Sequence, residues 1–138
     1  SDWTMPKNFY YATLVCFGAS YTLSGLSKIA SSEWNSGEML EAYFAIGFGL
    51  GDFGAWGSAQ PRSMLAAVSF VVAIVELIAL PLILVPKTRP WIWIAITLGQ
   101  TMMVLSSRVN HISLLLVFFH LLLLDESWWK TQERTAGA

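Results

Sequence analysis

Four polar side chains in this sequence lie within or at the end of long apolar stretches, and they are the residues most able to do chemistry. They are Lys28, Glu76, Gln100 and His120. Polar and ionisable groups are costly to place in apolar surroundings, so they mark candidate functional positions. We therefore take Glu76, Gln100 and His120 as candidate cofactor contacts, and Lys28 as the candidate base of a catalytic reaction.

Lys28 closes the first apolar stretch, and its position allows two interpretations. A partly desolvated lysine can lose its proton and act as a general base. Alternatively, its aliphatic stem can lie along an apolar surface while the ammonium group reaches water. The sequence leaves both interpretations open.

Glu76 and His120 are expected at similar depths in a helical bundle. Counted at about 1.5 Å per residue from the outer ends of the predicted helices, Glu76 lies roughly 20 Å deep and His120 roughly 14–18 Å deep. A hydrogen bond between them would satisfy both groups without any catalytic role. The functional alternative is that the same pair contacts a quinone, a pigment or a proton pathway. The cofactor stays open among a quinone, a lipid and a chlorophyll or haem.

A histidine could also serve as the axial ligand of a haem or chlorophyll. The chain has two histidines, His111 and His120. On one helix their separation is roughly 13 Å, so they cannot hold one haem from opposite faces. A single histidine ligand remains an alternative.

Patterns typical of a metal site, a phosphate loop or a serine nucleophile are absent from the sequence. There is no HExxH motif or Cys/His cluster, and the glycine-rich stretch over residues 47–57 lacks the GK[ST] ending of a phosphate loop. The single cysteine, Cys16, excludes an intrachain disulfide, and we expect it to be a small buried residue. We predict no metal site.

The composition of the 138-residue chain predicts an all-α integral membrane protein with one domain. Hydrophobic residues make up 55% and charged residues only 12%, with a mean hydropathy of +0.56. An average soluble domain has about 25% charged residues. The net charge of −1 offers no basic surface, so we expect no nucleic-acid partner.

The apolar stretches predict four membrane spans, over residues 8–29, 63–85, 91–106 and 109–126. Pro81 predicts a kink in the second span. Between the first two spans we expect an interfacial amphipathic helix over residues 37–48 and a glycine-rich loop over residues 49–62. A fifth span over residues 39–57 is the alternative. The predicted fold is an integral membrane four-helix bundle.

The charges and tryptophans suggest how such a bundle would be oriented. Five of the eight Lys and Arg residues fall on the side that holds both termini, which favours a cytoplasmic location for both ends. The first residues lack a basic region and a cleavage site, so the first span is expected to be retained. Tryptophans near the predicted helix ends are typical of a membrane interface: Trp3, Trp34, Trp91, Trp93, Trp128 and Trp129.

Several short motifs carry a family resemblance. They are Ser24-Gly25-Leu26-Ser27-Lys28-Ile29, then Trp34 and Gly37-Glu38-Met39-Leu40, then Val75-Glu76-Leu77 with Pro81, and Leu98-Gly99-Gln100. Between Tyr11 and Trp129 the chain resembles the HTTM family, which holds the membrane domain of vitamin K-dependent γ-carboxylase and is related to DoxX/MauE-like four-helix membrane proteins. The resemblance implies a four-helix membrane fold. It also implies that Lys28 matches the proposed base for vitamin K hydroquinone.

Three functions follow from these observations. The preferred one is a non-catalytic accessory subunit of a larger integral membrane complex, respiratory or photosynthetic, because packing surface is abundant and reactive groups are few. Its partners would be membrane lipids and other integral membrane subunits. The alternatives are a DoxX/HTTM-like quinone-linked redox enzyme that uses Lys28 and Glu76, and a small transporter or lipid-binding protein.

Overall fold

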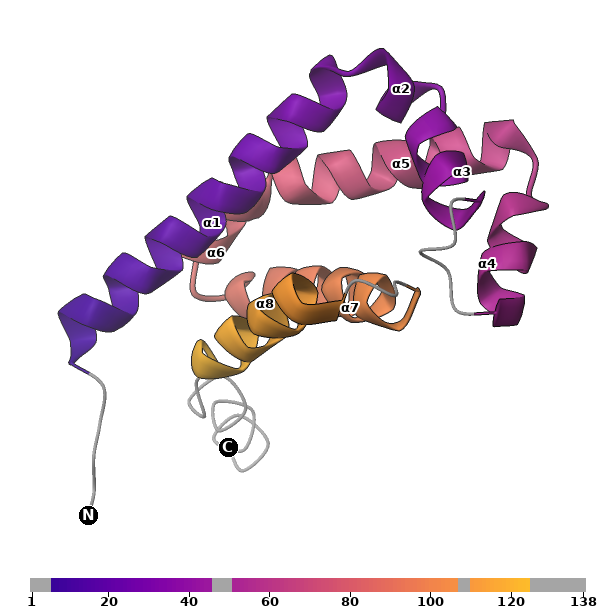
Figure 1. The fold of residues 1–138 in the computed structure, drawn as a ribbon. Helices are drawn as coiled ribbons and strands as arrows, with labels where there is room; N and C mark the ends of the chain where they lie inside the picture. The colour runs from indigo at the N-terminus through magenta and orange to yellow at the C-terminus, as the bar shows by residue number, and fades with distance from the viewer. Residues whose placement is uncertain (1–5, 46–50, 107–109, 125–138) are drawn as a thin grey trace, which may run out of the picture.

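A computed structural model describes residues 6–45, 51–106 and 110–124, and the chain is all-helical in these ranges (Figure 1). The helices are α1 (Lys7–Ala30), α2 (Ser32–Asn35), α3 (Glu38–Tyr43), α4 (Gly51–Ser58), α5 (Arg62–Leu77), α6 (Ala79–Leu84), α7 (Arg89–Ser106) and α8 (Asn110–Leu122). Figure 1 shows α1 running along α5 and α6, with α7 and α8 side by side beneath them and α4 at the far end.

The predicted membrane four-helix bundle is wrong. Among the described residues, every helix is either too short or too rich in polar residues to cross a bilayer. A span needs about 20 mostly apolar residues, whereas the stretch over residues 63–85 is divided between α5 and α6, and α8 has only 13 residues. The long α1 carries two lysines and many hydroxyl side chains. This finding also overturns the transmembrane-helix prediction and the multi-pass location with both termini cytoplasmic.

The glycine-rich stretch behaves differently from the predicted loop. Gly51–Ser58 forms α4, although glycine costs a helix about 1 kcal/mol relative to alanine. At Gly57 a Cβ atom would lie 2.4–2.7 Å from ring carbons of Phe44, so the missing side chain lets α4 approach that ring closely. The predicted interfacial helix over residues 37–48 is reduced to α3, and residues 46–50 lie outside the described ranges.

Helix α1 packs against α5 and α6 in antiparallel register through residues spaced three or four apart. Gly25 meets the backbone of α5, where an added Cβ would lie 2.4 Å from the Leu77 nitrogen. At Gly18 the corresponding distance to Ile83 Cγ2 is 2.9 Å. These two glycines therefore allow the helix axes to come close. The same face of α1 presents Tyr21 and Lys28.

The break between α5 and α6 is stabilised by a hydroxyl group of α1. Pro81 has no N–H, so it cannot bond to the Leu77 carbonyl four residues earlier. Thr22 Oγ1 donates to that carbonyl at 3.1 Å and accepts from the Leu80 N–H at 3.0 Å. One side chain thus satisfies a donor and an acceptor that the interrupted helix leaves open.

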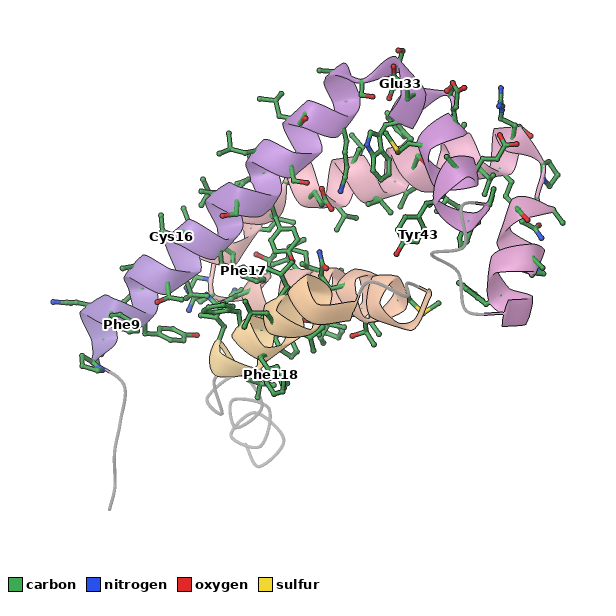
Figure 2. The ribbon with its side chains drawn as sticks, in the orientation of Figure 1. Phe9, Cys16, Phe17, Glu33, Tyr43 and Phe118 are labelled. Carbon is green, nitrogen blue, oxygen red and sulfur yellow. The ribbon has the colours of Figure 1, made fainter. Side chains whose placement is uncertain are left out.

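The core lies where α1, α6, α7 and α8 meet. Its buried members are Leu14, Tyr21, Ala79, Ile83, Ile92, Trp93, Ile96 and Leu123. Figure 2 shows Phe17 pointing from α1 toward α8, while Cys16 lies on the outer side of α1. The prediction of a buried Cys16 is wrong, because this residue is exposed. It falls one position away from the face that packs against the core.

Candidate functional site

A cavity of about 480 Å³ lies among α1, α3, α4, α5 and α7. This volume falls within the roughly 300–1,000 Å³ of typical small-molecule pockets. Aromatic side chains in its wall are Tyr21, Trp34, Tyr43, Phe44, Phe53 and Trp56. Figure 2 shows Tyr43 pointing from α3 toward α7. The rest of the wall is mostly aliphatic, so the polar groups within it stand out.

The central polar feature of the cavity is an ion pair between Lys28 and Glu76. Lys28 lies in the last turn of α1, where the helix dipole favours a cation, and its Nζ donates to Glu76 Oε1 on α5. The two side chains are 16% and 10% exposed. The Lys28 ammonium also lies 4.9 Å from the centre of the Trp34 ring. A buried pair of this kind is costly to break, because the remaining charge is left uncompensated.

Two oxygen atoms in the cavity wall lack hydrogen-bond partners among the described residues. They are Glu76 Oε2 and Ser69 Oγ, both buried and both on α5. Ser69 precedes Glu76 by two helical turns, so both lie on the same face. Buried polar atoms are nearly always paired in native structures, and an unpaired one costs about 1–3 kcal/mol. Two residues that line the cavity thus hold unused hydrogen-bonding capacity.

A second polar network lies behind the cavity, between α1 and α8. The Tyr21 hydroxyl lies 3.1 Å from His120 Nε2, and His120 Nδ1 is hydrogen-bonded to the Leu116 carbonyl. Since a carbonyl only accepts, Nδ1 carries the proton and Nε2 accepts from Tyr21. The Trp93 indole donates to the His120 carbonyl at 2.9 Å. The network ties α8 to α1 and α7.

Burial shifts the pKa values of both members of this network. Desolvation lowers the pKa of His120, and the hydrogen bond to Leu116 opposes the shift. Desolvation strongly raises the pKa of Tyr21, a hydrogen bond with Gln100 opposes the shift, and the charge of Glu76 adds to it. Near neutral pH the imidazole is therefore neutral and the phenol keeps its proton.

The structure brings the predicted site residues together in pairs that differ from the expected ones. The expected Glu76–His120 hydrogen bond is not formed, because Glu76 pairs with Lys28 and His120 with Tyr21. Lys28, Glu76 and Gln100 all line the cavity. His120 lies one hydrogen bond behind it, through Tyr21.

Sequence reasoning missed Tyr21 and Ser69. The signal was available in their spacing: Tyr21 lies seven residues before Lys28, and Ser69 lies seven residues before Glu76. A separation of two turns places each pair on one helix face. The phenol and hydroxyl therefore share the faces of the two charged residues.

The described side chains offer little to a metal or a haem. Within the described ranges, no three His, Cys, Asp or Glu side chains gather as a metal site. Both ring nitrogens of His120 are engaged, so neither is available as an axial ligand. The side chain of His111 lies outside the described part of the structure.

No family model, curated protein or solved structure matches this chain. The resemblance to HTTM and DoxX/MauE-like proteins therefore stays a prediction.

Proposed function

We propose that this protein binds a small, largely apolar molecule in the cavity between α1, α5 and α7, with a polar group of that molecule at the Lys28–Glu76 pair. The observation that carries the proposal is a mostly apolar cavity of about 480 Å³ with a largely buried ion pair in its wall. Ligand pockets typically combine apolar walls with a few placed polar groups that set orientation.

This proposal is nearest to the lipid-binding alternative from the sequence, and a quinone also belongs to the proposed ligand class. It differs from the enzyme alternative in the role of Lys28. Because Nζ donates to Glu76, Lys28 is a charged hydrogen-bond donor in this arrangement and not a free base. Binding, without catalysis, is the activity that these contacts support.

Gly99 provides a variant that tests the proposal without disturbing the packing. It lines the cavity, and an added Cβ would meet no other atom within 4 Å. Gly99→Leu should therefore place an isobutyl group in the cavity and take up part of its volume, while improving helix propensity. Gly99→Ala is the matched control, because it changes propensity and occupies little volume.

The experiment is a titration with the neutral fluorescent probe prodan, followed by its emission shift. We expect saturable binding by the native protein and by Gly99→Ala, and a loss of affinity of about tenfold or more in Gly99→Leu, since an occupied pocket rejects even small added groups. Equal affinity in all three proteins would mean that the probe binds elsewhere, and the proposal would be wrong.

A second candidate function is that of a non-catalytic subunit in a larger assembly. It is supported by exposed large apolar side chains on α1 and α8, among them Phe9, Leu23, Phe118 and Phe119. Figure 2 shows Phe9 and Phe118 on the outside of the helices. Large exposed apolar patches mark interaction sites more often than free surface.

Light scattering coupled to size-exclusion chromatography tests this second candidate. We expect the isolated chain to elute as an oligomer and Phe118→Ser with Phe119→Ser to reduce its mass to that of a monomer. A monodisperse monomer in the native protein would contradict a need for partners at this surface.

A further inference from the structure

We infer that the ligand carries a neutral hydroxyl group that donates a hydrogen bond to Glu76 Oε2 and accepts one from Lys28 Nζ. The inference rests on the proposed function and names the chemistry of the bound head group. It comes from the buried, unpaired Oε2 of Glu76, a residue that lines the cavity.

The hydrogen-bonding capacity of the ion pair defines what the ligand must offer. Glu76 Oε1 is engaged by Lys28, while Oε2 has no partner among the described residues. A carboxylate oxygen can only accept, so it requires a donor from the ligand. Lys28 has three N–H groups, and one of them is used by Glu76. A group that both donates and accepts, such as a hydroxyl, can engage both residues at once.

Charge excludes the other common head groups. A carboxylate ligand would place a second negative charge beside Glu76 and could offer no proton to Oε2. A cationic amine would lie beside the ammonium group of Lys28. A hydrocarbon or an ether would leave Oε2 buried and unpaired, at the cost of an unsatisfied charged acceptor. The pair is already neutral as a unit, so it selects a neutral group.

Ser69 is a second cavity-lining residue of α5 with an unpaired oxygen atom. Its hydroxyl is also buried without a partner among the described residues, and it lines the cavity two turns before Glu76. The separation along the helix is about 10 Å. Val72 lies in the wall between these two positions. The apolar body of the ligand therefore lies along Val72, with its hydroxyl at the Glu76 end.

Three probes that share one ring system test the inference by calorimetry at near-neutral pH: 2-naphthol, 2-methoxynaphthalene and 2-naphthoate. The ether keeps the acceptor oxygen and removes only the donor. We expect 2-naphthol to bind about tenfold or more tightly than either of the others, because a site built around a hydroxyl rejects analogues that lack it. Gly99→Leu should weaken the binding of 2-naphthol and of the ether alike.

Glu76→Gln supplies a second readout that a merely structural role would not move. With the amide oxygen facing Lys28, the amide nitrogen takes the place of Oε2, and an acceptor becomes a donor. The preference for 2-naphthol over the ether should then disappear. Circular dichroism checks that the variant is folded. If it is not, the comparison of the three probes on the native protein still tests the inference.

The outcomes separate the inference from the proposed function. Equal binding of naphthol and ether, both abolished by Gly99→Leu, overturns the hydroxyl inference and leaves the binding function intact. Tighter binding of 2-naphthoate also overturns the inference. Failure of all three probes to bind overturns both.

Discussion

At the scale of single residues, the proposed binding site depends on the Lys28–Glu76 pair. Lys28→Met removes the cation and leaves Glu76 as a buried charge without a partner, which should cost about 3–5 kcal/mol of folding free energy. Adding Glu76→Leu replaces the whole pair with apolar groups and should recover most of that loss. Urea unfolding of both variants measures the difference. If Lys28→Met is as stable as the native protein, the pair is not buried as described.

The second residue-scale prediction concerns His120 and pH. Burial lowers its pKa in the folded protein, so the unfolded chain binds the proton more readily. The contribution of His120 to the free energy of unfolding is largest above the ordinary histidine pKa of about 6.5. It falls as the pH is lowered through that value.

Urea midpoints between mildly alkaline and mildly acidic pH give the measurement. His120→Gln should flatten the slope, and His111→Gln is the control because it removes the only other histidine. If His111→Gln removes the slope and His120→Gln keeps it, the assignment to His120 is wrong.

At the scale of helices, close packing of α1 on α5 depends on Gly25. A Cβ there would meet backbone atoms of Leu77 and Ala73 at 2.4 and 2.7 Å, and backbone cannot move aside as a side chain can. Gly25→Ala should therefore cost about 1–3 kcal/mol or more. Gly99→Ala, where an added Cβ meets nothing, should stabilise the protein by up to about 1 kcal/mol. Thermal unfolding compares the two substitutions, and equal effects would contradict the described contact.

The helices also show what could be read from the sequence. Apolar stretches indicate α1, the segment that holds α5 and α6, α7 and α8. Continuous apolar residues with few helix breakers favour helices. Pro81 indicates an interruption of the α5–α6 stretch, but the sequence does not show that Thr22 of α1 satisfies the Leu77 carbonyl there. Helix α4 depends on a glycine packed against Phe44. Such tertiary contacts are invisible to local patterns.

The residues of the candidate site could be predicted from the sequence, but their hydrogen-bond partners could not. Lys28, Glu76 and Gln100 could be singled out because they are polar groups in apolar surroundings. Their partners could not, because depth counted along separate straight spans ignores the antiparallel register of α1 and α5. That register places Lys28 opposite Glu76, and His120 is hydrogen-bonded to Tyr21 instead.

At the scale of the whole molecule, composition alone led to the wrong class. The hydrophobic fraction of 55% sums apolar residues over helices that are short, interrupted or, in α1, interspersed with polar side chains. Some of those residues form the core, others line the cavity, and many are exposed. The cavity and the exposed apolar surface could both attract an apolar probe, so a test of function has to tell them apart.

Photoaffinity labelling makes that distinction most directly. A diazirine derivative of 2-naphthol, activated on the native protein and mapped by peptide mass spectrometry, should label the cavity wall around Tyr21, Lys28 and Val72, and Gly99→Leu should abolish that labelling. Labels that gather instead on Phe118 and Phe119, unchanged by Gly99→Leu, would contradict a ligand site in the cavity.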